Sequence, residues 1–213
     1  MKKIIIAVLL SMLLFGSICF IEFNICKLSY RKNKYEAEEL LRIAHNLVDN
    51  QSTENKTGSI NNDSSTSNVL NNNKETKMNK SENDIIGILY IEKLDIEAPV
   101  KEGTTQEVMK TSVGHFSESD FWNGNVSLAS HNSGTSMHYF QNIHTLKVND
   151  RIKYKTQLGE KIYKVQSIDT IKDTDWSKVV KNDDYKNQEN TITLITCING
   201  QPDYRLCVRG VEI

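Results

Sequence analysis

The chain has 213 residues, with 26 basic and 27 acidic side chains, four cysteines and two prolines. This length allows one ordinary domain with appendages. A formal net charge of −1 lacks the basic excess typical of nucleic-acid binding, so we expect no nucleic-acid partner. Four dispersed cysteines are too few for a disulfide scaffold.

Residues 1–26 are predicted to be a transmembrane signal-anchor. An almost unbroken apolar run extends from Ile4 to Ile21, and about 20 such residues cross a bilayer as a helix. No small-x-small cleavage site follows, so we expect an uncleaved single-pass anchor rather than a removed signal peptide. The positive-inside rule alone would keep the following chain in the cytoplasm, because basic residues follow the run: Lys27, Arg31, Lys32 and Lys34.

Residues 27–84 are predicted to link the anchor to the globular part. Within residues 31–49, four apolar side chains recur at helical spacing, which predicts a juxtamembrane helix: Leu40, Ile43, Ala44 and Leu47. From Asn50 to Asn83 the composition is mainly Asn, Ser, Thr, Lys and Glu. Such a segment buries too little apolar surface to fold, so we expect a disordered tether with an r.m.s. span on the order of 30 Å.

Residues 85–213 are predicted to be one domain of short strands. The clearest hairpin joins Arg151–Thr156 to Lys161–Ile168 through a glycine-containing turn. Short helical turns are expected at Gln106–Thr111 and Met137–Asn142. Many strands with few helices predict an all-β barrel or sandwich. Other strands are predicted at Ile85–Ile91, Leu94–Val100 and Asn125–Ser130.

The run Thr193–Cys197 is a predicted strand that ends in a cysteine. A short polar loop follows, and a second strand, Tyr204–Arg209, returns beside it. Cys197 therefore lies at the mouth of a hairpin, with Arg205 on the returning strand. A cysteine is a useful nucleophile when a nearby histidine or other positive charge favours its thiolate.

Four histidines of the domain are available to such a thiol: His115, His131, His138 and His144. His131 is the best candidate because it ends a predicted strand in a polar Ser-His-Asn-Ser-Gly context. A structural role is expected for His115, and surface positions for His138 and His144. The guanidinium of Arg205 is placed to bind a substrate carbonyl or a developing oxyanion, whereas Arg209 is expected to be solvated.

The same histidines and cysteines could instead bind zinc or form a disulfide. The histidines and cysteines are zinc-ligand types, but their spacings match no compact zinc motif. We therefore expect no metal and no other cofactor. A disulfide between Cys197 and Cys207 would consume the nucleophile, and the sequence leaves this pairing open.

Three of these motifs, in this order, resemble those of the sortases, the cysteine transpeptidases that fix surface proteins to the Gram-positive cell envelope. Thr193-Leu194-Ile195-Thr196-Cys197 is similar to the family's Thr-Leu-x-Thr-Cys signature. Asn125–His131 is similar to its histidine strand, and Arg205 to its arginine. Gly87–Leu94 resembles the opening strands, although Glu92 replaces the usual proline. The resemblance covers about residues 85–213.

The resemblance implies an eight-stranded β-barrel in which His131, Cys197 and Arg205 surround one groove. Cys197 would attack the threonine carbonyl of an LPxTG-like sorting signal, and a peptidoglycan-precursor amine would receive the acyl group. His131 would protonate the leaving amine and then act as the base. Arg205 would hold the substrate or stabilise the oxyanion, and residues 170–190 would shape recognition of the signal.

The same resemblance bears on location and subclass. Sorting substrates lie outside the cell, so the domain is expected to be extracellular despite the basic residues that follow the anchor. Pilin-polymerising members often carry an Asp-Pro-aromatic lid before the barrel. The only prolines are Pro99 and Pro202, so a housekeeping or class D-like enzyme is expected.

Two other functions stay open. One is another envelope cysteine peptidase, such as an NlpC/P60-like enzyme, in which the cysteine precedes the histidine; here His131 precedes Cys197. The other is a non-catalytic, membrane-tethered binding module. That function predicts that thiol reagents modify Cys197 no faster than Cys207.

Overall fold

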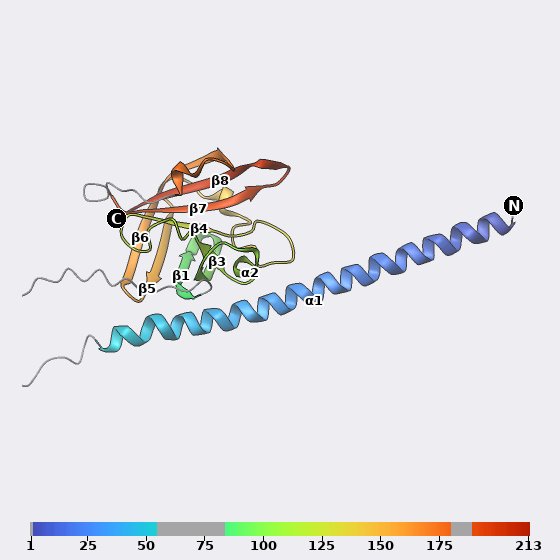
Figure 1. Cartoon of the computed structure of the whole chain (residues 1–213), viewed down its shortest axis with the longest axis horizontal. Coiled ribbons are helices and arrows are strands. Elements are labelled where there is room, and N and C mark those ends of the chain that lie inside the picture. Colours follow the sequence, from blue (N-terminus) through green and yellow to red (C-terminus); the bar gives the residue numbers. More distant parts are fainter. Residues whose placement is uncertain (1, 55–83, 180–188) are drawn as a thin grey trace, which may run out of the picture.

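The computed structural model describes residues 2–54, 84–179 and 189–213 (Figure 1). Its N-terminal part is one helix, α1 (Lys2–Glu54). The sequence predicted an anchor to residue 26 and a separate helix over 31–49, but α1 runs through both. No glycine or proline lies between Ser17 and Glu54 to interrupt it. The first residues of the predicted tether belong to α1, and the rest, residues 55–83, lie outside the described residues.

The remaining chain forms the predicted all-β, eight-stranded barrel. Its strands pair in the closed order β1-β2-β3-β4-β7-β8-β6-β5. Alternating burial in β5 and continuous burial in β4 match a barrel in which β4 is covered on both faces. The strands are β1 (Ile85–Ile91), β2 (Ile96–Glu102), β3 (Val113–His115), β4 (Asn125–Ala129), β5 (Arg151–Thr156), β6 (Gly159–Lys172), β7 (Thr191–Ile198) and β8 (Gln201–Glu212).

Short helices lie between the strands of the barrel: α2 (Gln106–Met109) and the 3-10 turns η1 (Glu92–Leu94), η2 (Ile143–Thr145) and η3 (Trp176–Lys178). The helix predicted at Met137–Asn142 is wrong, because its first two residues have no regular structure and the other four form turns. Two of its backbone donors bond to distant residues instead of continuing a helix: Met137 N–H to Lys110 O and Phe140 N–H to His131 O. Polar and small residues before Met137 favour such turns over a helix.

The C-terminal half of α1 packs on β1 and β2. Four side chains on one face are buried: Asn33, Ala37, Ala44 and Val48. Of the apolar residues whose spacing predicted a helix here, Ala44 is buried, whereas Ile43 and Leu47 remain 36% and 40% exposed. Small residues on the buried face allow the helix to approach the barrel closely.

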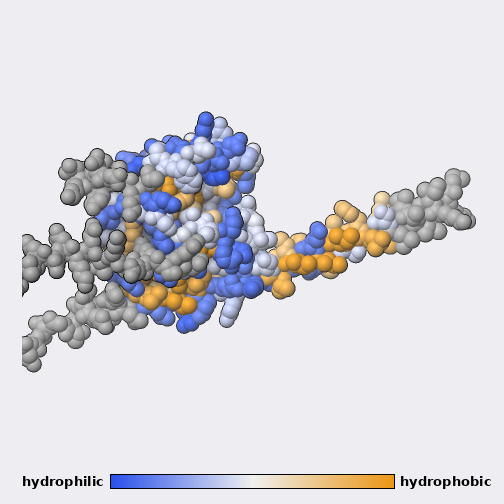
Figure 2. Space-filling view, viewed as in Figure 1, coloured by the Kyte–Doolittle hydropathy of each residue, from blue (hydrophilic) through white to orange (hydrophobic). Residues whose placement is uncertain are grey.

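The N-terminal half of α1 extends beyond the barrel, and apolar side chains dominate its described surface (Figures 1 and 2). By length and composition the described helix contains a segment able to cross a membrane.

Candidate active site

The ends of β4 and β7 place His131 beside Cys197. These strands pair in parallel, with Ala129 opposite Ile195. His131 and Cys197 each follow this pair by two residues, so they lie at the same level along the two strands. The pairing continues past β4, since Ser130 N–H donates to Ile195 O at 3.4 Å and Thr196 Oγ1 donates to Ser130 O at 2.8 Å.

The polar residues of the two strand motifs secure this register. Asn125 Oδ1 accepts hydrogen bonds from Thr191 Oγ1 at 3.1 Å and Thr193 Oγ1 at 2.8 Å. All three side chains are buried. A buried amide and hydroxyls that satisfy one another fix one alignment of two strands, because a slip would leave them unpaired. The threonines before Cys197 therefore position the cysteine.

Arg205 lies directly across the hairpin from Cys197. The two residues are partners in the antiparallel β7–β8 pair. The guanidinium is held close to the hairpin, since Nη1 donates to Pro202 O at 2.6 Å and to Tyr204 O at 2.8 Å. Nη2 lies 3.9 Å from Asp173 Oδ2.

His131, Cys197 and Arg205 line one groove of about 390 Å³, which we call the active-site groove. Its floor is apolar and its rim carries charged residues. The floor residues are Phe116, Ala129, Ile171, Val179 and Ile195, and Met109, Asp173, Asp175 and Trp176 also line it. Cys197 and Thr196 border a second hollow of about 410 Å³ on the side of Asn132 and Gln201. The thiol therefore stands between two hollows.

His131 is half-buried and chemically available. Burial, and secondly the charge of His138, lower the pKa of its imidazole, so the neutral form is favoured. Among the described residues, no hydrogen-bond partner contacts its buried Nε2. The described residues therefore leave Nε2 without a competing hydrogen bond that would hold its proton.

The two cysteines of the barrel differ sharply. Cys197 is exposed and Cys207 is buried, and both are free thiols. Cys207 pairs with Ile195 in the sheet and packs in the cluster that forms the groove floor. Burial raises the pKa of Cys207 to about 11. The disulfide left open by the sequence does not form, and Cys207 supports the floor as a small apolar side chain.

Sequence reasoning missed Asn132, the residue after His131. Its Nδ2 donates to Cys197 O at 2.7 Å and to Asn199 Oδ1 at 3.0 Å. This amide ties the loop after β4 to the β7–β8 turn. The only signal was its place directly after the candidate histidine, since the spacing of 65 residues to Cys197 conceals the contact.

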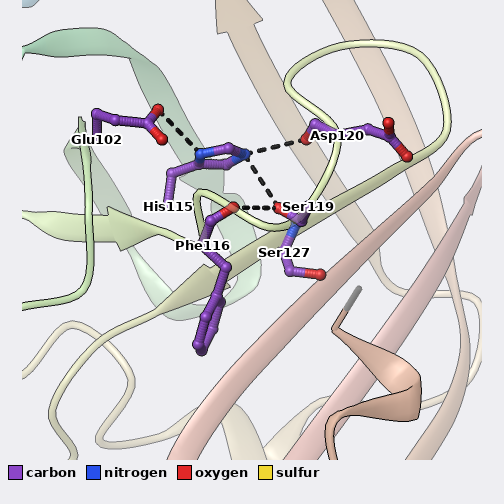
Figure 3. A network of polar contacts seen from close by, with 6 residues as sticks. All are labelled: Glu102, His115, Phe116, Ser119, Asp120 and Ser127. Atoms are coloured by element: carbon purple, nitrogen blue, oxygen red, sulfur yellow. Dashed lines mark hydrogen bonds and ion pairs between the residues drawn. The ribbon is translucent and has the colours of Figure 1, made fainter. Parts of the chain in front are cut away.

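His115 belongs to a different, buried network (Figure 3). Nδ1 contacts Glu102 Oε2 at 3.0 Å, and Nε2 contacts Asp120 O at 3.0 Å and Ser119 Oγ at 3.1 Å. Although the order Ser–His–Glu resembles a hydrolase triad, Ser119 Oγ donates to Phe116 O at 2.7 Å and is 3% exposed. A nucleophile without access to substrate cannot react, so this network is structural, as the sequence predicted.

His138 and His144 lie outside the strand pairs that contain Cys197. His138 is half-buried under α1, where its ring stacks on Tyr30 with centroids 5.7 Å apart. His144 is exposed, as predicted, and borders the second hollow. No group of three or more His, Cys, Asp or Glu side chains is arranged to hold a metal ion within the part of the chain that the structure describes.

Comparisons with known proteins identify this architecture. A sequence profile of the sortase domain matches residues 89–213. Sortase A from Corynebacterium diphtheriae (lid mutant) is similar in structure, with TM-score 0.56 and 23% identity over 62% of this chain and 72% of that chain. Sortase C1 from Streptococcus agalactiae is similar with TM-score 0.53 and 29% identity, over 61% of this chain and 67% of that chain. Sortase C-1 from Actinomyces oris is similar with TM-score 0.56 and 22% identity, over 61% of this chain and 75% of that chain. No curated protein sequence matches the chain.

The closed barrel carries a cysteine and a histidine level with each other at its rim, and its fold is that of the sortase-type cysteine transpeptidases. The family profile covers more than half of the chain, from residue 89 to 213. The chain belongs to the sortase family, whose members act as transpeptidases in anchoring surface proteins.

Proposed function

We propose that the protein is a membrane-anchored, extracellular sortase that cleaves an LPxTG-like sorting signal after its threonine. The acyl group passes through a thioester on Cys197 to an amine of a cell-wall precursor. The observation that carries this proposal is the parallel β4–β7 register, which sets His131 level with Cys197, with Arg205 opposite the thiol in one groove.

The first half of the reaction is acylation. Neutral His131 takes the proton of the Cys197 thiol, the resulting thiolate attacks the threonine carbonyl carbon, and the carbonyl oxygen becomes an oxyanion. The oxyanion then collapses, the C–N bond to glycine breaks, and the His131 imidazolium donates its proton to the leaving amine. A thioester and a neutral imidazole remain. The unpartnered Nε2 of His131 supports its role in this proton transfer.

The second half is transfer. An acceptor amine attacks the thioester carbonyl, and neutral His131 takes a proton from that amine. When the C–S bond breaks, the new amide leaves and the thiolate and imidazolium are restored. The hollow on the Asn132 side of Cys197 gives the acceptor an approach separate from the groove that holds the signal.

Arg205 stabilises the oxyanion or holds the signal's backbone carbonyl. Its guanidinium is pre-positioned by the carbonyls of Pro202 and Tyr204, so little side-chain entropy is lost when a substrate oxygen binds. The apolar floor of the active-site groove suits the leucine and proline of the signal.

A peptide panel tests the proposal. The full-length protein, under reducing conditions, is incubated with LPxTG-like peptides of varied sequence, and its intact mass is measured. We expect a peptide adduct that maps to Cys197 and is missing in Cys197→Ala. Cys207→Ala serves as the matched control and should retain the adduct.

The alternatives give other results. A non-catalytic binding module would form no adduct with any peptide, and a thiol reagent would modify Cys197 and Cys207 equally. The exposure of Cys197 and the burial of Cys207 favour faster modification of Cys197. A hydrolase would release acid product even when an amine acceptor is in excess. The absence of any adduct, or release of acid product alone in excess amine, would overturn the transpeptidase proposal.

A further inference from the structure

The docked half of α1 connects the apolar segment directly to the active-site end of the barrel. Tyr30 stacks on His138, and Asn33 Nδ2 donates to Thr135 O at 3.1 Å. Thr135 and His138 belong to the loop that begins at His131. The helix residues nearest the apolar segment therefore contact the rim that carries the candidate catalytic histidine.

Residues farther along α1 contact β2 and the end of β5 that faces away from the rim. His45 Nε2 contacts Glu97 Oε1 at 2.9 Å, and Asp49 Oδ1 accepts from Lys155 Nζ at 2.6 Å. Lys155 lies one residue before the end of β5, near the β5–β6 turn. At about 1.5 Å per residue, Tyr30 and Asp49 are about 28 Å apart along the helix. Such spaced contacts fix the direction of the barrel axis relative to α1.

The contact face has a regular helical spacing. Tyr30, Asn33, Ala37, Ala44 and Val48 follow one another at intervals of three, four, seven and four residues. This is the spacing of one continuous helix face. Asn33, Ala37, Ala44 and Val48 are at most 8% exposed, so the face is sealed against the barrel along its length.

Figure 1 shows the resulting arrangement. The N-terminal half of α1 leaves the barrel on one side, and the C-terminus of β8 lies on the other. Because β8 runs from the β7–β8 turn to the C-terminus, that turn lies on the side of the apolar segment. Cys197 and Arg205, which adjoin the turn, lie on this side as well.

The height of this rim above a membrane follows from the sequence. The apolar run ends between Ile21 and Ile25, five to nine residues before Tyr30, which corresponds to about 8 to 14 Å along the helix. The headgroup layer is about 5 to 8 Å thick on each side. A helix tilt of about 20° shortens these heights by less than a tenth. The rim thus lies at or just above the headgroups.

We propose that α1 is a rigid bracket rather than a flexible tether, and that it holds the active-site rim of the barrel against the phospholipid headgroup layer. Lys27, Arg31, Lys32 and Lys34 are exposed at this level of the helix, where they attract anionic headgroups. Because α1 docks on the barrel before residues 55–83 begin, those residues do not set the distance from the membrane. This proposal rests on the anchoring role of the apolar segment.

Fluorescence quenching in vesicles tests the orientation. The full-length protein is inserted into vesicles of zwitterionic and anionic phospholipid that carry a nitroxide on the headgroup. A dye is attached through an azide-bearing residue at Ser133, in the rim loop, or at Leu158, in the distant β5–β6 turn; both positions are exposed. We expect several-fold stronger quenching at position 133. Equal quenching, or stronger quenching at position 158, would overturn the proposal.

Ala44→Glu tests whether the docked helix causes this orientation. Ala44 is fully buried against the barrel, so a carboxylate there must break the contact to remain hydrated. We expect the difference between the two dye positions to collapse. Asn46→Glu adds the same charge at an exposed position of α1 and should preserve the difference. An unchanged difference in Ala44→Glu would show that α1 is not the bracket.

Two further measurements separate this proposal from the function. Flotation of each variant with vesicles reports anchoring, and the peptide adduct on Cys197 reports chemistry. An adduct with equal quenching at both positions refutes the bracket alone. Unequal quenching without any adduct refutes the transpeptidase proposal and leaves the bracket standing. The adduct in Ala44→Glu also verifies that the barrel remains folded.

Discussion

Two histidines end neighbouring strands of the barrel and have opposite surroundings. His115, at the end of β3, has both ring nitrogens engaged by Glu102, Ser119 and Asp120, and it is 1% exposed. His131 follows β4, is half-buried, and has no partner on Nε2 among the described residues. The difference teaches that a histidine available for chemistry lines a groove and keeps one ring nitrogen unengaged, whereas a structural histidine is buried with both ring nitrogens in contact with polar groups.

The largest expected effect on catalysis follows the removal of His131. We expect His131→Gln to lower kcat for transpeptidation by about 10²- to 10⁴-fold, the range supplied by a general acid–base. The melting temperature should change little, because Nε2 gives up no hydrogen bond. Product formation by mass spectrometry and thermal melts measure both effects. Full activity in this variant would contradict the role of His131.

The same contrast extends to the two arginines of β8. Arg205 lines the active-site groove, while Arg209 pairs with Thr193 farther down the strand. We expect Arg205→Ala to lower kcat by about 10²- to 10³-fold, as for the loss of an oxyanion donor. Arg209→Ala is the matched control and should change kcat only slightly. Similar losses in both variants, measured with one peptide, would refute the assignment.

Removing His115 should affect stability instead of chemistry. His115→Leu takes away the imidazole that pairs with buried Glu102. We expect the free energy of unfolding to fall by about 3–5 kcal/mol, typical of breaking one partner from a buried pair. Urea denaturation measures this loss, and kcat per folded molecule should stay close to that of the parent. A variant that remains stable but has lost its catalysis would reverse the roles of the two histidines.

The smallest expected effect concerns pH. The positive charge of His138 is the second cause, after burial, of the lowered pKa of His131. His138→Gln removes this charge, so the imidazolium of His131 becomes more favourable and its pKa rises. Because the acidic limb of kcat/KM reports this group, that limb should move to higher pH. His144→Gln should leave the limb in place, and an unmoved limb in His138→Gln would contradict the electrostatic coupling.

Local patterns made much of the barrel predictable. The β5–β6 hairpin and the β7–β8 hairpin join strands that are adjacent in sequence, so alternation and turn residues were sufficient to predict them. The strands are longer than predicted, since β6 continues to Lys172 and β8 to Glu212. The parallel β4–β7 pair has no such local signal. Only the resemblance to a family indicated that His131 and Cys197 lie in one groove.

Contacts between distant segments could not be predicted. Asn132 reaches Cys197 across 65 residues, and Asn33 reaches Thr135 across 102. The face of α1 that docks on the barrel was not predicted, because small residues permit the close approach while the large apolar Ile43 and Leu47 remain partly exposed. Tertiary packing determines both the long-range contacts and the docked face of α1, and a short stretch of sequence carries no information about it.

The parallel pairing of β4 with β7 also determines when the site can form. Asn125 and Thr191 are 66 residues apart, and contacts of such large sequence separation form slowly, because a long loop must close first. During synthesis the chain emerges from its N-terminus, so α1 and β1 to β6 precede the nucleophile. Arg205 and the strand that completes the barrel come last. The thiol therefore acquires its histidine and arginine only when nearly the whole domain has been synthesised, which delays assembly of the site until folding is almost complete.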